Sequence, residues 1–231
     1  MEALPCIVVP AFIALVVALF IVGIVQARRR REECGRLAVA LGFDYHPDDP
    51  WDLPTRYAFF DLFKRGHGRR ASNILCGQAD GRAVTAFDYQ YTTGSGKNRT
   101  THHCQAAVFA LPIQAAGLHL RTETVFDHLA AWVGYDDLDF ESEEFSRRYH
   151  VKSTDRKFAY DIFHAQLIDY LLRCGTVPDI EMRGPVMVLS ERQGPVENFR
   201  RFLAIGSTIV RSIPDYVQSA RGLKGAAGGA P

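Results

Sequence analysis

Residues 73 to 92 read Asn-Ile-Leu-Cys-Gly-Gln-Ala-Asp-Gly-Arg-Ala-Val-Thr-Ala-Phe-Asp-Tyr-Gln-Tyr-Thr, and this stretch decides the fold class. Asp80-Gly81 stands between two strand-like runs, residues 73–78 and 82–92, and is typical of a type I′ turn, in which both central residues need positive φ. In the second run Phe87, Tyr89 and Tyr91 alternate with polar residues, which predicts that they share one face of a strand. The stretch therefore predicts a β-hairpin.

Further strands are expected on both sides of this hairpin. A polar tip at 93–98 leads into a third strand at 99–111, closed by Pro112, with 118–121 as a possible fourth. Residues 180–182 and 186–189 read as a second hairpin, turned at 183–184, and Pro185 marks it as an edge. We expect an α+β fold: an antiparallel sheet of six or seven strands with helices packed on one face.

The helices are expected between and after these strands. Apolar periodicity predicts short helices at 53–63 and 125–133, and one at 155–173 capped by Thr154. Residues 145–152 look extended. A last helix begins at Pro195 and keeps apolar residues at helical spacing to Ile213, so it should cover the sheet.

The N-terminal region predicts a membrane anchor. Residues 6–26 contain no charged side chain, a length of helix that would cross a bilayer. Arg28, Arg29, Arg30 and Arg31 follow directly and should lie at anionic headgroups on the cytoplasmic side, with the N-terminus outside. The alternative, a cleaved secretory peptide, is disfavoured because the first residues lack positive charge.

The chain is expected to have four parts. They are the N-terminal tail and transmembrane helix (1–26), a basic juxtamembrane helix ended by Gly42 (27–45), a cytoplasmic α+β domain (46–218) and a disordered Gly/Ala-rich tail (219–231). The 27 Lys and Arg residues nearly balance the 26 Asp and Glu residues, which argues against nucleic acid as a partner. The five scattered cysteines fit reduced thiols in the cytosol.

Several short segments resemble a bacterial family of single-span, membrane-anchored proteins of unknown function that is common in actinobacteria. The segments are Leu37–Phe43, Phe60–Gly66, Phe87–Tyr91, Phe145–Val151 and Asp155. The resemblance covers about residues 35 to 215. It implies the fold and the membrane location. It carries over no active site, since these segments are packing and turn residues.

His102, His103 and Cys104 form the most chemically suggestive cluster. In a strand, His102 and Cys104 point to one face and His103 to the other. A tip centred near residues 95–96 would place Asp88 opposite His103, where it could orient the imidazole as a base, with Cys104 as a nucleophile. Zinc would need two further ligands, for which His67 and His164 are conceivable. The alternative is a cross-strand polar pair and a buried thiol.

Two other motifs lack residues that the corresponding binding sites require. Gly94-Ser-Gly-Lys97 joins two strands and lacks the following Ser or Thr of a phosphate loop. The acidic run from Asp136 to Glu144 has Ser142 where a calcium loop needs glycine, so a solvated strand is expected there. No cofactor or metal is predicted, and no common hydrolase, zinc-protease, dinucleotide or kinase motif occurs.

We therefore expect a non-enzymatic interaction module, held at the membrane and bound to an unknown protein partner. Its working surface would be the aromatic sheet face at Phe87, Tyr89 and Tyr91, if the helices leave that face uncovered. One alternative is a hydrolase built on Asp88, His102, His103 and Cys104. Another is a small-ligand carrier with a cavity beneath the helix that begins at Pro195.

Overall fold

The computed structural model describes residues 4–122 and 135–223, with side chains from residue 13 onward. The strands are β1 (Asp44–Asp48), β2 (His67–Ala79), β3 (Arg82–Thr93), β4 (Thr100–Thr122), β5 (Asp136–Leu138), β6 (Tyr149–Ser153) and β7 (Asp179–Arg192). The helices are α1 (Leu4–Leu41), α2 (Leu53–Arg56), α3 (Glu143–Arg148), α4 (Arg156–Ile162), α5 (Ala165–Arg173), α6 (Asn198–Ser212) and α7 (Asp215–Arg221), with 3-10 turns η1 (Leu62–Lys64) and η2 (Gly96–Asn98). The expected helix at 125–133 lies outside the described residues.

One antiparallel sheet contains all seven described strands, in the order β1-β2-β3-β4-β6-β5, with β7 on the other edge of β4. The predicted α+β class and strand number are confirmed. The turn between β2 and β3 has positive φ at Asp80 (52°) and Gly81 (74°), as the sequence predicted. In the part of the chain that the structure describes, β7 pairs only with β4, so Pro185 does mark an edge strand.

β4 organises the sheet because it is long enough to pair with three other strands. Its first half pairs with β3, its second half with β6, and both halves with β7. β4 continues past Pro112, although proline has no backbone N–H to donate. The β4–β7 register shifts between Ala110 and Ala115, and this irregularity accommodates the proline. The expected fourth strand is thus the far half of β4, and the predicted second hairpin at 180–189 is wrong because it is one strand, β7.

The sheet has two differently covered faces. The helix face carries Ala86, Ala107 and Phe109 and is covered by α3–α7 and the end of α1. The aromatic face carries Phe87, Tyr89 and Tyr91 and is covered by the segment from Trp51 to Phe63. Helical turns therefore lie on both faces, not on one as expected. α6 approaches the helix face closely: a Cβ added at Gly206 would meet the Phe109 ring at 2.2 Å.

Several local predictions were wrong where tertiary contacts or neighbouring side chains decide the backbone. The run 53–63 forms only α2 and then η1, and the expected extended segment at 145–152 begins with α3. The helix at 155–173 is interrupted at Phe163 and His164, where His164 has an extended backbone and starts α5. β1 occupies part of an expected loop, and α7 runs to Arg221, three residues into the expected tail.

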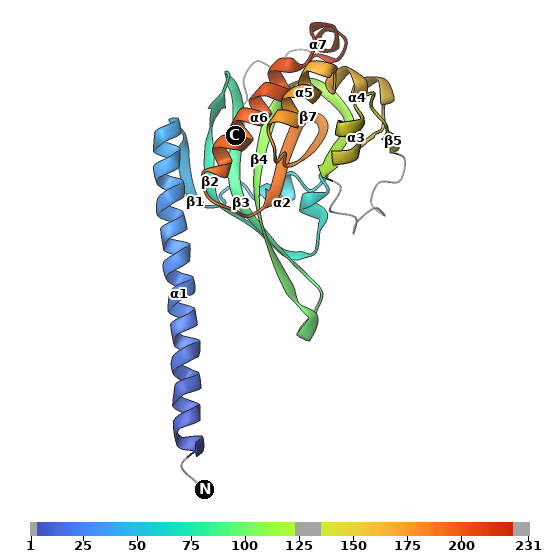
Figure 1. Ribbon diagram of the computed structural model, residues 1–231. Coiled ribbons are helices and arrows are strands. Elements are labelled where there is room, and N and C mark those ends of the chain that lie inside the picture. The colour runs from blue at the N-terminus through green and yellow to red at the C-terminus, as the bar shows by residue number, and fades with distance from the viewer. Residues whose placement is uncertain (1–3, 123–134, 224–231) are drawn as a thin grey trace.

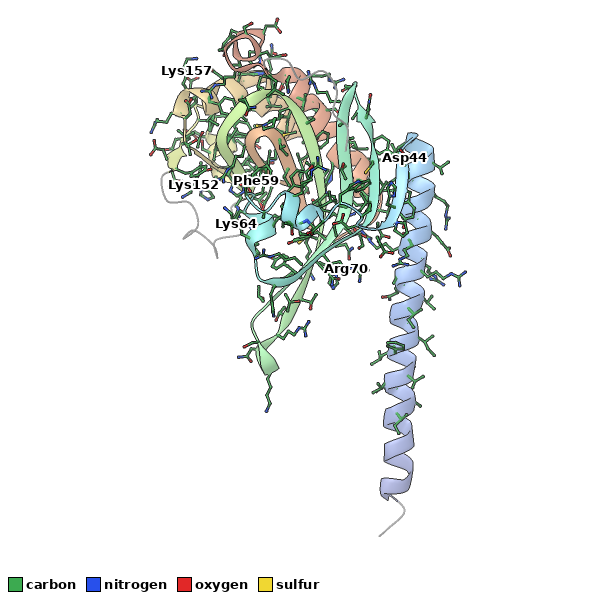
Figure 2. All side chains as sticks on the ribbon, turned by 180° about the vertical axis from the view of Figure 1, so that it is seen from behind. Asp44, Phe59, Lys64, Arg70, Lys152 and Lys157 are labelled. Atoms are coloured by element: carbon green, nitrogen blue, oxygen red, sulfur yellow. The ribbon has the colours of Figure 1, made fainter. Side chains whose placement is uncertain are left out.

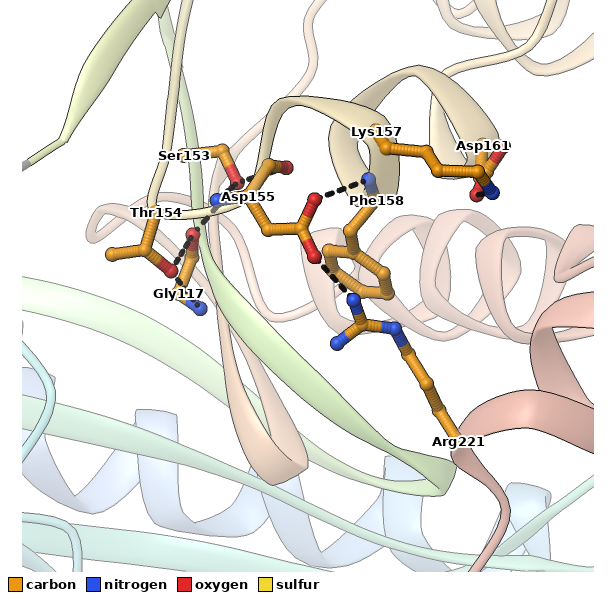
Figure 3. A network of polar contacts seen from close by, with 8 residues as sticks. All are labelled: Gly117, Ser153, Thr154, Asp155, Lys157, Phe158, Asp161 and Arg221. Carbon is orange, nitrogen blue, oxygen red and sulfur yellow. Dashed lines mark hydrogen bonds and ion pairs between the residues drawn. The ribbon is translucent and has the colours of Figure 1, made fainter.

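Asp155, not Thr154, caps α4, as Figure 3 shows. An Asp155 carboxylate oxygen accepts a hydrogen bond of 3.0 Å from the Phe158 amide, and the other oxygen forms an ion pair with Arg221 of α7. Thr154 instead accepts a 3.0 Å hydrogen bond from the Gly117 amide of β4. The Arg221 guanidinium lies 4.9 Å from the centre of the Phe158 ring, so this network joins α7 to α4.

The N-terminal helix corrects the prediction of a membrane anchor. Among the described residues, no helix combines the length and the apolar character that a membrane crossing requires. The predicted transmembrane helix, its orientation and the cell-membrane localisation are therefore wrong.

α1 is one continuous helix whose C-terminal part belongs to the folded domain. Cys34, Leu37 and Ala38 are buried in the core of the helix face, and Gly42 ends the helix with a φ of 69°, as predicted. Its N-terminal part extends away from the sheet, in the same direction as the β3–β4 hairpin (Figures 1 and 2). The C-terminal part of α1 and the rest of the domain thus share one core.

Candidate functional site

The structure separates the predicted Asp88, His102, His103 and Cys104 cluster. In the β3–β4 register Asp88 lies opposite Gln105, and His103 lies opposite Gln90. The tip contains η2, which moves the register by two positions from the expected one. Asp88 and His103 share the helix face, whereas His102 and Cys104 point to the aromatic face. The predicted Asp88–His103 pair is therefore wrong.

The Asp88 carboxylate holds α1 against the sheet. Arg30 donates two hydrogen bonds to its oxygens, at 2.6 and 2.7 Å, and Asn73 donates a third at 2.8 Å. Arg30 also donates to the Gly194 carbonyl at 2.9 Å. The side chain of Arg30 is only 20% exposed, so this arginine points into the domain rather than to a headgroup. Arg28 pairs with Glu32, and Arg31 lies 3.8 Å from Asp48.

The remaining members of the cluster lack the properties of a catalytic pair. Burial raises the pKa of the Cys104 thiol to about 11, so the thiol is protonated at neutral pH. The His102 ring stacks on Tyr91 with centroids 4.8 Å apart and is hydrogen-bonded to the Thr93 hydroxyl at 2.8 Å. Both contacts hold the imidazole in place, and neither of them is to an activated nucleophile.

The conceivable zinc ligands are dispersed. His67 is hydrogen-bonded to the Thr92 carbonyl at 2.8 Å, and His164 to the Ser212 carbonyl at 3.0 Å, near the end of α6. Within residues 4–122 and 135–223, no three His, Cys, Asp or Glu side chains gather closely enough to hold a metal ion.

His102 and Cys104 do border an open cleft of about 610 Å³ on the aromatic side of the sheet. Its walls are Leu62 and Arg65 from the η1 segment, Tyr91 from β3, the first residues of β4 and the last residues of β7. Thr101 and Arg192 are exposed at its rim. The cleft thus lies at the base of the projecting β3–β4 hairpin, beside the outer edge of the sheet.

A buried layer of charged side chains continues from this cleft toward β6. Asp61 accepts from Arg65 at 2.9 Å and from Arg121 at 2.8 Å, and its amide donates to Glu181 at 2.9 Å. Arg121 also lies 3.9 Å from Asp179 and donates to His119 at 3.0 Å. Arg65 and Asp179 line both the cleft and this layer. Charge pairing in a dry environment therefore fixes the cleft wall.

Desolvation shifts the pKa values in this layer. Burial raises the pKa of Glu181 to about 7 and also raises the pKa of Asp179, although Arg121 acts against it. The pKa of His119 is well below its usual value because of burial and the nearby Arg121. Among the described residues, Arg65 Nε and Glu181 Oε1 are buried without a hydrogen-bond partner. The layer therefore has hydrogen-bonding capacity that its own contacts do not use.

This layer was missed by reasoning from the sequence. Its only signal is alternation: His119 and Arg121 alternate with Leu118 and Leu120, as Asp179 and Glu181 do with Ile180 and Met182. Charged residues at every second position of a strand normally face solvent. Here they are buried because residues 59–65 lie over them, with the Phe59 carbonyl accepting from Arg183 at 3.0 Å.

Two other expected surfaces are filled. Phe87, Tyr89 and Tyr91 are 0%, 1% and 7% exposed, and Phe63 packs on the first two with ring centroids 6.1 and 5.0 Å apart. The aromatic face is therefore covered, so the condition for its use as a working surface is not met. Beneath α6, the contact between Gly206 and Phe109 leaves no space at that point for the cavity of a small-ligand carrier.

These features define the class of the protein, which is an α+β protein built on one curved antiparallel sheet. No family model matches the sequence, and no curated protein matches it. Among solved structures, the chain is similar to the crystal structure of the mycobacterial trehalose monomycolate transport factor A, TtfA. The two share 15% sequence identity over 81% of this chain and 96% of the other, with a TM-score of 0.59. At this identity the similarity shows the fold.

Proposed function

We propose that this chain is a non-catalytic binding protein, and that the cleft beside Arg65, Thr101 and Arg192 is its binding surface. The observation that carries the proposal is the combination of an open cleft with a fixed, charged wall and a protonated thiol where a hydrolase would need a thiolate. The similarity to a transport factor supports a role in assembling or assisting a transport process rather than in turnover.

The first test separates binding from hydrolysis. We expect the purified full chain to hydrolyse p-nitrophenyl acetate and butyrate no faster than serum albumin, and Cys104→Ala to change neither rate. We also expect iodoacetamide to alkylate Cys104 more slowly than a free thiol at pH 7.5, because burial keeps the thiol protonated. Turnover that disappears in Cys104→Ala would favour the hydrolase instead.

The second test asks whether the cleft is the binding surface. A photo-crosslinking benzoylphenylalanine would replace Thr101 at the cleft rim or, as a matched control, the exposed Arg200 of α6. In cells of the native host, we expect a discrete adduct only from position 101. Adding Arg192→Glu, a charge reversal at another exposed residue of the cleft, should abolish that adduct. Equal labelling from both positions would contradict a specific surface.

A further inference from the structure

A second hollow, of about 680 Å³, lies away from the cleft between α4, α5 and residues 139–142. Its floor is apolar: Phe140, Phe163 and Ile168 are nearly buried and belong to the core of the helix face. Ala165 and Leu172 of α5 form one wall. Tyr160 borders the other side, and its hydroxyl donates a hydrogen bond of 2.9 Å to the Asp139 carbonyl. We call this hollow the acidic groove.

The rim of the acidic groove carries negative charge only. Asp139 and Glu141 flank Phe140, and Asp169 stands on α5, while no lysine, arginine or histidine is among the described residues that line the groove. Asp169 has a partner, Arg173, at 2.7 Å. Asp139 and Glu141 are exposed and form no ion pair with any described residue.

Two of the neighbouring acids are paired within the domain, whereas Asp139 and Glu141 line the groove without an ion pair to a described residue. Asp137 pairs with Lys152 at 3.1 Å and Glu144 with Arg148 at 2.5 Å. The acidic run therefore does not act as one solvated face: Asp137 and Glu144 are neutralised by the domain, while the carboxylates of Asp139 and Glu141 stand beside the apolar floor of the groove. Phe140 itself is turned into the core, in edge-to-face contact with Phe145 and Phe163.

We propose that the acidic groove binds a short cationic segment of a partner protein, with one large apolar side chain over the floor and Lys or Arg on both sides of it. An apolar floor with one sign of charge on its rim selects for apolar area and complementary charge together. The same rim repels nucleic acid and anionic lipid. This site is separate from the cleft and does not depend on its function.

The probe is a rhodamine-labelled peptide in which one tryptophan stands between two pairs of arginines, titrated with the full chain at about 150 mM salt and followed by fluorescence anisotropy. We expect Asp139→Lys with Glu141→Lys to weaken binding at least about tenfold, because attraction at the rim becomes repulsion. The matched control, Asp44→Lys with Glu33→Lys, makes the same change of net charge at exposed positions outside the groove. It should bind like the wild type.

Filling the groove tests the apolar part. Ala165 is exposed and helical, so Ala165→Trp should add bulk over the floor without removing a core contact, and should weaken binding by a similar factor. A peptide with glutamates in place of the arginines should not bind. Equal loss in the control pair, or no binding by the wild type, would overturn the proposal. So would a concentration-dependent dimer in sedimentation that Ala165→Trp removes, since the occupant would then be a second copy.

Discussion

At the scale of single residues, Asp88 is the ionisable group on which the attachment of α1 depends. Its side chain is 5% exposed and it receives both arms of the Arg30 guanidinium, which is the geometry in which arginine binds carboxylate most strongly. A partly buried ion pair adds little net stability over an apolar replacement. Removal of one partner, however, leaves the other charge buried without a counter-charge.

We therefore predict that Asp88→Asn lowers the free energy of unfolding by about 2–3 kcal/mol, because the Arg30 charge stays partly buried without its counter-charge. Urea denaturation followed by circular dichroism measures the change. Arg70→Ala is the matched control: Arg70 pairs with Asp48 at 2.9 Å, but its side chain is 61% exposed, so its loss should cost less than about 0.5 kcal/mol. Equal effects would show that the Arg30–Asp88 pair is screened like a surface pair.

The raised pKa of Glu181 predicts how the stability of the protein depends on pH. Its pKa in the folded protein is about 7, against an ordinary value near 4.5, so the folded state holds a proton that the unfolded state releases. The contribution of Glu181 to stability is consequently lost as pH rises from about 4.5 to 7, by up to about 3 kcal/mol, and is constant above that. His119 acts in the opposite direction below pH 6.5, because its pKa is lowered and the unfolded chain binds the proton more tightly.

A comparison of the wild type with Glu181→Gln isolates the carboxyl group from His119. We expect the difference in unfolding free energy between the two proteins to move in favour of Gln as pH rises from 5 to 8, since the amide has no charge to bury. Urea titrations at pH 5, 6, 7 and 8 measure this. A difference that is flat across the series would mean that Glu181 titrates at its ordinary pKa.

At the scale of elements, α6 shows how close packing reverses an ordinary helix preference. Alanine normally stabilises a helix interior over glycine by about 1 kcal/mol. At Gly206 a Cβ would meet the Phe109 ring at 2.2 Å, so Gly206→Ala should instead destabilise the protein by about 1–3 kcal/mol. At Gly35 of α1 the nearest atom is Tyr45 Cδ1 at 3.7 Å, an ordinary contact, and Gly35→Ala should stabilise by about 0.5–1 kcal/mol. Thermal denaturation of the two variants should therefore give shifts of opposite sign.

Elements whose conformation is decided locally could be predicted from the sequence. Asp80-Gly81 has the residues that a type I′ turn requires, and Gly42 ends α1 in the left-handed region because nothing else fits there as readily. β1 could not be predicted: Asp44 to Asp48 contains two aspartates and a proline, and it is extended because β2 offers it an edge to pair with. α3 begins with Ser142 as its cap, within a run whose alternating acids indicated a strand.

The site was less predictable than the fold because its residues are joined only by the folded chain. Asp61, Arg121 and Glu181 each look like ordinary surface charges in sequence, and about 60 residues separate each from the next. Conversely, His102, His103 and Cys104 are adjacent in sequence but face opposite sides of β4. Adjacency in the chain suggested a site there, whereas the sheet register and the cover from η1 determine where charged groups meet.

At the scale of the whole molecule, α1 contributes to the folded domain over only part of its length. Between Ile13 and Val25 its large apolar side chains are 41–70% exposed, while Cys34 and Ala38 are fully buried. The Arg30–Asp88 pair marks the point at which the helix reaches the sheet. Figure 2 shows the same division, with the N-terminal part of the helix standing apart from the strands.

This division predicts different outcomes for two truncations. A chain that begins at residue 27 keeps Arg30 and the buried end of α1, so its free energy of unfolding should stay within about 0.5 kcal/mol of the full chain, and its reduced apolar surface should lower its tendency to aggregate. A chain that begins at residue 42 loses Cys34, Leu37 and Ala38 from the core and leaves Asp88 without its arginine, so it should lose several kcal/mol. Urea denaturation and light scattering of the three proteins test this. If the shorter truncation unfolds as easily as the longer one, the exposed part of α1 must stabilise the domain through contacts that its described side chains do not make.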